Sequence, residues 1–179
     1  HKVDNYIACG DITGKIILYY NYLSTKNIIT SILHWHSSQV NYLTFTKDSA
    51  YLLSGGNEAV LVLWQLDTGH KQYLPRLGHY IKSIITDIKG QYYAISLYNN
   101  QIKIISSITS QIISTIKGIG IGLLDLNHTN IISSDYNDNI ILYNSLYGTI
   151  DYYDIIQQKV IKKLKILNIF NNITTITNK

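Results

Sequence analysis

Short runs of apolar residues recur along the chain, each bounded by a polar turn, and in many of them apolar and polar positions alternate. The clearest run is LLSGGNEAVLVLWQLDTG, residues 52–69, which has the form of a strand, a tight polar turn and a second strand ending on Trp64. Branched and aromatic side chains fit a pleated surface, and the connections carry the Gly, Asn, Asp and Ser that tight turns require. No helical periodicity of useful length is present, so the pattern predicts an all-β protein.

The predicted strands fall into four groups. The first group begins part-way through a unit and has three strands, at 6–11, 15–22 and 28–36. The second has strands at 40–46, 51–56, 60–66 and 71–77, and the third at 81–88, 92–98, 101–108 and 111–117. The fourth is less regular, with strands at 131–136, 139–144, 148–155 and 160–166.

These groups repeat with a nearly constant period. The residues that close the units are Tyr19, Trp64, Ser106 and Tyr153, which are 45, 42 and 47 residues apart. A period of roughly 40–45 residues with several short strands per unit is typical of a WD-repeat β-propeller blade. We therefore predict a fragment of about three to four blades of one WD40-type β-propeller. The predicted units are 1–36, 37–78, 79–118 and 119–167, and residues 168–179 are a tail or the start of a second propeller.

The length of 179 residues is too short for a complete propeller, which needs about four to eight blades. The chain begins at His1 and contains no methionine, so we expect it to be part of a longer protein. A blade hides its two faces only against neighbouring blades. Such folds serve mostly as platforms for partners, which favours a binding function over an enzymatic one.

The charge is mildly positive. A net charge of +4 and a pI of about 9.0 permit contact with nucleic acid without showing it. Positive charge is densest in KVIKKLKI, residues 159–166. Two interpretations are open: an outer strand whose alternate lysines lie in water, or an edge that faces RNA phosphates. The residues of that edge would be Lys159, Lys162, Lys163 and Lys165.

Residues that could carry chemistry are present but not grouped. Cys9 is the single cysteine, which excludes an intramolecular disulfide, favours an intracellular setting, and stands at a buried-type strand position. His34 and His36 would share one face of a strand as half of a metal site, but no third ligand is placed to complete it. KGIGIG at 117–122 resembles a phosphate-binding glycine loop, yet no predicted helix follows it.

The sequence also offers no pair of neighbouring carboxylates for acid–base catalysis and no candidate membrane-spanning segment. Asp87 and Asp125 are isolated, and no apolar run approaches the roughly 18 residues of a membrane helix. We therefore expect no catalytic residue, no metal, no cofactor, no membrane contact and no small-molecule substrate.

The second unit carries the polar pattern of WD repeats, in which a buried hydrogen-bond chain joins a His, a Ser or Thr, an Asp and a Trp. The matching positions are His36, Ser54, Glu58 and Trp64. Glu58 is one methylene longer than Asp, and Gln65 replaces the Asp that normally follows the Trp. A buried indole N–H and imidazole need partners, and a satisfied network fixes one arrangement of the blade. We interpret these four residues as structural.

The other units keep less of this pattern. In the first, Cys9, Thr13 and Tyr19 stand at the Ser, Asp and Trp positions. In the third, Gly78 and His79 keep the opening pair and Ser96 keeps the Ser, whereas Asn100 and Ser106 replace Asp and Trp. The fourth offers only GTIDYYD, residues 148–154.

Several runs are unusual for a generic WD repeat. In order they are CGDITGKIILYYN (9–21), SILHWHSSQVNYLTF (31–45), YLLSGGNEAVLVLWQL (51–66) and LPRLGHYIKSI (74–84). In sequence and spacing they resemble the family of WD repeat-containing protein 75, also known as U3 small nucleolar RNA-associated protein 17. The resemblance covers residues 1–117 and, beyond them, only GTIDYYDIIQQK at 148–159. It places the chain in the later part of the first of two propellers.

This resemblance implies a nucleolar, and hence nuclear, scaffold of the small-subunit processome and the U3 snoRNP. Its implied partners are the other UtpA (t-UTP) subunits, further processome proteins and the 5′ external transcribed spacer of pre-rRNA. Its implied roles are pre-rRNA processing, 18S rRNA maturation and, in some organisms, transcription by RNA polymerase I. Two other hypotheses stand beside it: a generic WD-repeat adaptor of another complex, and a catalytic propeller with polar residues around its channel.

Overall fold

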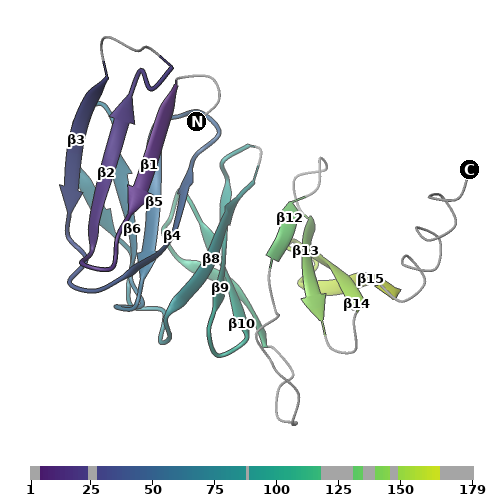
Figure 1. The fold of residues 1–179 in the computed structure, drawn as a ribbon. Helices are drawn as coiled ribbons and strands as arrows, with labels where there is room; N and C mark the ends of the chain where they lie inside the picture. The colour runs from purple at the N-terminus through teal and green to yellow at the C-terminus, as the bar shows by residue number, and fades with distance from the viewer. Residues whose placement is uncertain are drawn as a thin grey trace, which may run out of the picture.

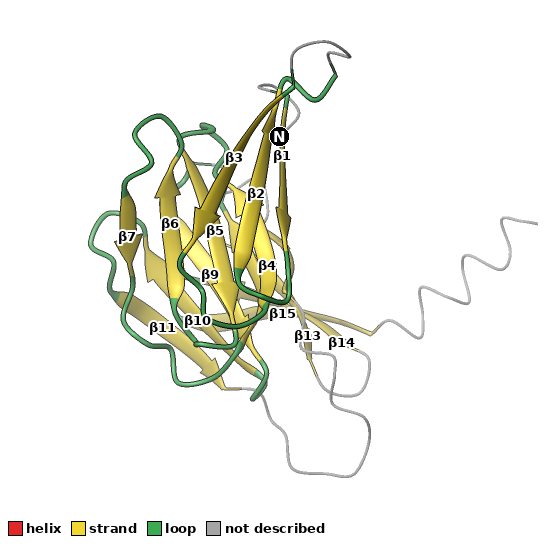
Figure 2. Cartoon of the chain, turned by 60° about the vertical axis from the view of Figure 1, so that its left-hand side comes forward, coloured by secondary structure: helices red, strands yellow, loops and turns green. Residues whose placement is uncertain are grey.

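The computed structural model consists of β-sheets. It describes residues 5–23, 28–87, 89–117, 131–134, 140–145 and 149–165. These residues form fifteen strands and contain no helix. The strands make four antiparallel sheets, which Figures 1 and 2 show side by side in chain order. The predicted all-β architecture of antiparallel sheets is therefore confirmed.

Each sheet is a meander of consecutive strands. The first sheet contains β1 (Tyr6–Gly10), β2 (Lys15–Tyr20) and β3 (Ile29–His34). The second contains β4 (Val40–Phe45), β5 (Tyr51–Gly56), β6 (Leu61–Gln65) and β7 (Lys71–Tyr73). The third contains β8 (Ile81–Thr86), β9 (Tyr92–Leu97), β10 (Gln101–Ser106) and β11 (Ile112–Lys117). The fourth contains β12 (Ile131–Ser134), β13 (Ile140–Ser145), β14 (Thr149–Asp154) and β15 (Lys159–Lys165).

The strand that differs most from its prediction is β7. The sequence predicts it over 71–77, but the ladder to β6 ends at Tyr73. Pro75 has no amide hydrogen to give to a ladder, so the strand cannot continue through it. The backbone still follows β6, because the amide of Leu74 donates to the carbonyl of Leu61 at 3.0 Å. Leu74 and Leu77 remain buried against the sheet.

The second sheet is buried on both faces. On one face, Val62 and Trp64 pack with Ile16 and Leu18 of the first sheet. On the other face, Leu61, Leu63 and Leu53 pack with residues of the third sheet that include Ile81, Ile84 and Ile95. The third sheet in turn packs Ile102 and Ile104 against Ile141 and Tyr153 of the fourth. This face-to-face stacking explains why β6 reads as a continuous apolar run rather than as an alternating one.

Two glycines let neighbouring sheets approach closely. A Cβ on Gly55 would lie 2.6 Å from Cγ2 of Ile81, and one on Gly10 would lie 2.8 Å from Cγ1 of Val40. Val40 and Ile81 are the first residues of β4 and β8. The second and third sheets thus insert the first side chain of their leading strand into a notch left by a glycine in the sheet before.

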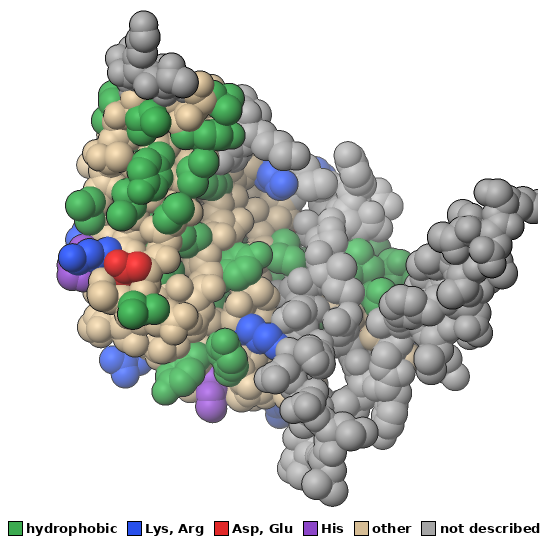
Figure 3. Space-filling view, viewed as in Figure 1, with side chains coloured by type: hydrophobic (Ala, Val, Ile, Leu, Met, Phe, Trp, Pro, Cys, Tyr) green, Lys and Arg blue, Asp and Glu red, His purple; other side chains and the backbone are tan. Residues whose placement is uncertain are grey.

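The outer face of the first sheet is exposed. Ile7 and Ile32 are 39% and 66% exposed, and Figure 3 shows apolar side chains gathered over β1–β3. Cys9 lies on this face, opposite Ile17, and its side chain is exposed. The expectation of a buried cysteine was therefore wrong, because no sheet of the described residues covers this face.

Candidate functional site

The four residues of the predicted network are joined in the second sheet. Nε1 of Trp64 donates to Oγ of Ser54 at 2.8 Å, and Ser54 Oγ lies 2.8 Å from Nε2 of His36. Nδ1 of His36 lies 3.1 Å from Oε2 of Glu58. His36, Ser54 and Trp64 are 0 to 1% exposed. The side chains form one continuous chain of hydrogen bonds from the core to the surface turn.

Strand register accounts for the inner half of the network. Ser54 on β5 is opposite Val62 on β6, and Trp64 is opposite Leu52, so Ser54 and Trp64 are diagonal neighbours on one face. Glu58 lies in the turn between the two strands. Its extra methylene, relative to Asp, lets its second oxygen accept from the amide of Ser38 at 2.6 Å.

A neutral imidazole and an ionised Glu58 satisfy every atom of this chain. Nδ1–H donates to the carboxylate, Nε2 accepts from the Ser54 hydroxyl, and the Ser54 oxygen accepts from the indole. Burial lowers the pKa of His36 below its ordinary value, against the opposing effect of Glu58. Burial alone would raise the pKa of Glu58, but hydrogen bonds, including that from His36, outweigh it and lower the pKa. Both shifts favour this protonation state.

The third unit does not contain the residues expected at these positions. In the second sheet, Ser54 pairs with Leu43 on one side and Val62 on the other. In the third sheet, the residue at the same place in the ladder is Ile95, which pairs with Ile84 and Lys103. By the same register Ile105 stands at the position of Trp64, and Leu77, four residues before β8, at that of His36. All three are buried in one apolar cluster.

The assignments of Ser96, Asn100 and Ser106 were thus wrong by one residue. A shift of one residue turns a strand side chain to the opposite face. Ser96 pairs with Ser83 after the same bulge at which Gly55 pairs with Tyr42, so Ser96 corresponds to Gly55. His79 is exposed and not part of a network. The sequence did contain a signal for this register. His36 stands four residues before Val40, the first residue of β4, and Leu77 stands four residues before Ile81, the first residue of β8.

The first and fourth sheets have their own polar contacts. In the first, Cys9 and Tyr19 keep the diagonal relation of Ser54 and Trp64, while Asp11 accepts hydrogen bonds from the backbone amide and hydroxyl of Thr13. In the fourth, Ile141 takes the ladder position of Ser54 and pairs with Tyr153, so Tyr153 corresponds to Val62 and the buried Ile155 to Trp64. The assignment of Tyr153 to the Trp position was thus wrong by two residues. The hydroxyl of Tyr153 lies 2.6 Å from Oγ of Ser114 on β11. Burial and the neighbouring Asp151 raise the pKa of Tyr143 to about 12.

The lysines predicted at β15 lie on an outer strand but not on one surface. Lys162 is opposite Tyr152, with Nζ 5.6 Å from the ring centroid. Lys163 is opposite Asp151, on the other face, with Nζ 3.7 Å from the carboxylate. Lys159 is opposite Asp154, and the side chain of Lys165 lies outside the described residues. Strand alternation therefore divides this charge between two faces.

The remaining candidates give no reactive cluster. Within the described ranges, no three His, Cys, Asp or Glu side chains are close enough to hold a metal ion. Asp87 is buried and accepts from the amide of Tyr92 at 3.0 Å. Residues 118–122 of the glycine run and Asp125 lie outside the described residues. The described part of the chain has no helix of the length and apolarity that crossing a bilayer needs.

Stacked antiparallel sheets with a Trp–Ser–His chain between strands define a WD-repeat β-propeller. The solved β-propeller domain of Cps50 (Swd1) from Myceliophteria thermophila matches 90% of this chain and 52% of its own, with a TM-score of 0.73 and 16% sequence identity. At this identity the match shows the fold alone.

The family model of the WD repeat-containing protein 75 first beta-propeller matches residues 1–100, and the chain belongs to this family. U3 small nucleolar RNA-associated protein 17 of Schizosaccharomyces pombe is 42% identical over 113 residues, which are 60% of this chain and 14% of the relative. WD repeat-containing protein 75 of Danio rerio is 34% identical over 168 residues, which are 93% and 20%. NET1-associated nuclear protein 1 of Saccharomyces cerevisiae is 39% identical over 92 residues, which are 51% and 10%. The chain thus spans a fifth or less of each of these relatives, and the resemblance seen in the sequence is confirmed.

Proposed function

We propose that this chain is part of a non-enzymatic scaffold protein of ribosome biogenesis, which acts in the small-subunit processome. The observation that carries the proposal is the 42% identity over 113 residues to a protein named for its association with U3 small nucleolar RNA. A second relative is named as a nuclear protein, which supports a nuclear and nucleolar location. Residues 1–167 would be consecutive blades of one propeller.

The proposed partners are the UtpA (t-UTP) subunits, other processome proteins and the 5′ external transcribed spacer of pre-rRNA. The proposed roles are pre-rRNA processing and 18S rRNA maturation, with support of RNA polymerase I transcription as a further role. Flat sheet faces that pack on one another, with turns left exposed at both strand ends, suit a scaffold better than a substrate cleft.

Direct RNA contact at β15 is a separate part of the proposal. Lys159 and Lys162 would approach phosphates from one face and Lys163 from the other, so a single strand of RNA would meet only part of the set. Replacing Lys159 and Lys162 by Glu should reduce cross-linking to pre-rRNA, whereas unchanged cross-linking would leave these lysines as a solvated outer edge.

The test of the main proposal is purification of the complete tagged protein from growing cells. U3 small nucleolar RNA and processome proteins should co-purify with it, and the tag should be nucleolar. Depletion should lower 18S rRNA while large-subunit rRNA is initially maintained, which serves as the internal control. A protein absent from the nucleolus and from pre-ribosomal particles would refute the proposal and favour an adaptor of another complex.

A further inference from the structure

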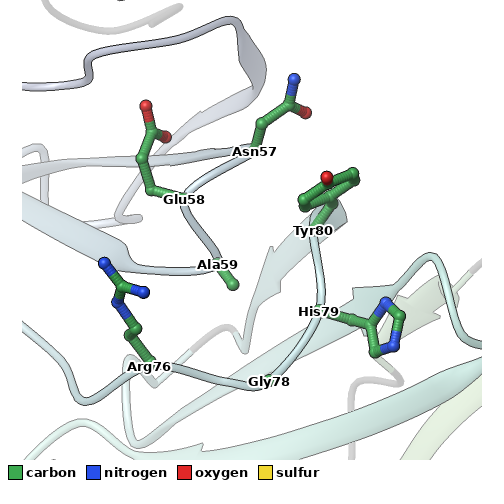
Figure 4. A pocket seen from close by; sticks show the side chains of 7 residues that line it. All are labelled: Asn57, Glu58, Ala59, Arg76, Gly78, His79 and Tyr80. Carbon is green, nitrogen blue, oxygen red and sulfur yellow. The ribbon is translucent and has the colours of Figure 1, made fainter.

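An open pocket lies where the β5–β6 turn meets the connection from β7 to β8. Its volume is about 350 Å³, and Figure 4 shows its lining side chains. They are Asn57, Glu58, Ala59, Arg76, Gly78, His79 and Tyr80. In the figure Ala59 lies between Arg76 on one side and Tyr80 on the other. A cation and an aromatic ring therefore frame one small apolar surface.

The backbone around this pocket is held in place. The amide of Leu77 donates to the carbonyl of Ala59 at 2.8 Å, which ties the connection to the turn. The amide of Tyr98 donates to the carbonyl of Tyr80 at 3.0 Å, which ties the other side to the third sheet. A site whose backbone is already fixed loses little conformational entropy when it binds.

Arg76 is the free charge of the pocket. It is exposed and makes no ion pair or hydrogen bond with any described residue. The nearby carboxylate of Glu58 is already engaged: one oxygen lies 3.1 Å from His36, and the other accepts from the Ser38 amide at 2.6 Å. The guanidinium is thus available for a carboxylate supplied by a partner, which it can hold through two hydrogen bonds.

An aromatic surface lies beside this charge. Tyr80 and Tyr98 are each 53% exposed, and their rings meet edge to face with centroids 6.4 Å apart. Tyr and Arg are enriched among the residues that dominate protein–protein binding energy. A nucleic acid would instead require several cations spaced along a backbone, and the charged side chains lining this pocket are Arg76 and Glu58.

We propose that this pocket docks a segment of a protein partner that carries an Asp or Glu next to an apolar or aromatic residue. The carboxylate pairs with Arg76, and the apolar side chain covers Ala59 and the Tyr80–Tyr98 pair. The inference concerns the chemistry of the partner and holds whichever assembly contains the protein.

The test uses the complete protein with a photo-cross-linking amino acid at position 79, activated in cells. The cross-linked peptide should belong to another protein and should contain an Asp or Glu beside an apolar residue. Binding of the purified partner should weaken at least about tenfold in Arg76→Glu and in Tyr80→Ala. Lys47→Glu, the same change of charge in the hairpin at the other end of the sheet, should bind as wild type.

Charge reversal separates recognition from misfolding. Arg76→Glu should keep the wild-type melting temperature, and replacing the partner's carboxylate residue by Lys should restore its binding. A cross-link to RNA, a cross-linked segment without a carboxylate, absence of any cross-link, or no restoration by the charge swap would overturn the proposal. None of these outcomes bears on co-purification with U3 small nucleolar RNA, which tests the proposed function independently.

Discussion

Replacing Trp64 by Ala tests whether the buried network anchors the second blade. The indole is 1% exposed, and a tryptophan buries about 150–250 Å². At about 25 cal/mol per Å² this corresponds to about 4–6 kcal/mol, which is an upper value because the unfolded chain already buries part of that area. Measured losses for such large-to-small changes are about 3–5 kcal/mol, and we expect Trp64→Ala to fall in that range.

The assay is thermal unfolding of the complete protein, followed through the transition of this propeller. A loss of about 3–5 kcal/mol should lower the melting temperature by about 6–20 °C. Trp35→Ala is the matched control, because Trp35 is only partly buried and makes none of the hydrogen bonds of the network, although its ring meets that of His36 edge to face, so its effect should be smaller. A melting temperature of Trp64→Ala within error of wild type would refute the role of Trp64 as a buried anchor.

The third unit suggests a sharper comparison. Replacing His36, Ser54 and Trp64 together by Leu, Ile and Ile would copy the apolar set found in the third sheet. Replacing all three side chains leaves fewer buried polar groups without a hydrogen-bond partner than replacing one of them. The triple variant should therefore lose less stability than the sum of the three single variants, and strict additivity would argue against coupling within the network.

Three further outcomes are expected. Burial lowers the pKa of His36 below its ordinary value of 6.5, so this imidazole binds a proton more readily in the unfolded chain than in the folded one. Stability should therefore fall as the pH drops below about 6.5. The melting temperature measured from pH 7 to 5 should depend less on pH in His36→Gln than in wild type. Gly55→Ala should cost about 1–3 kcal/mol by crowding Ile81, and Ile81→Ala in the same chain should recover part of that loss in a chemical denaturation series. Ser114→Ala leaves the buried Tyr153 hydroxyl without its partner and should cost about 1–3 kcal/mol, whereas Tyr153→Phe added to it should cause little further loss.

The strands and the second-unit network could be predicted because they depend on local signals. Turn residues fix where strands end, and the spacing from His36 to Trp64 matches a pattern that buried polar groups constrain tightly. Every predicted strand is present, and β7 is short because Pro75 interrupts its ladder. Local sequence signals were therefore sufficient to predict most of the architecture.

The third-unit assignments failed because Ser and His have no fixed preference for one face of a sheet. Ser96 and Ser106 have the same ten-residue separation as Ser54 and Trp64, and so do Ile95 and Ile105. The pairing of β8 with β9 decides between these two sets. The pocket at Arg76 was missed for a similar reason, since its residues come from two turns that meet only through the stacking of sheets.

The glycine notches also bear on how the chain assembles as it is synthesised. Gly55 leaves the ribosome 26 residues before Ile81, and Gly10 leaves it 30 residues before Val40. At about 5–20 residues per second, each notch stays empty for about one to six seconds. The second sheet thus completes the first, and the third completes the second, so these blades should lock in order from the N-terminus. A ribosome pause just before residue 81 should prolong the exposure of the second sheet to chaperones.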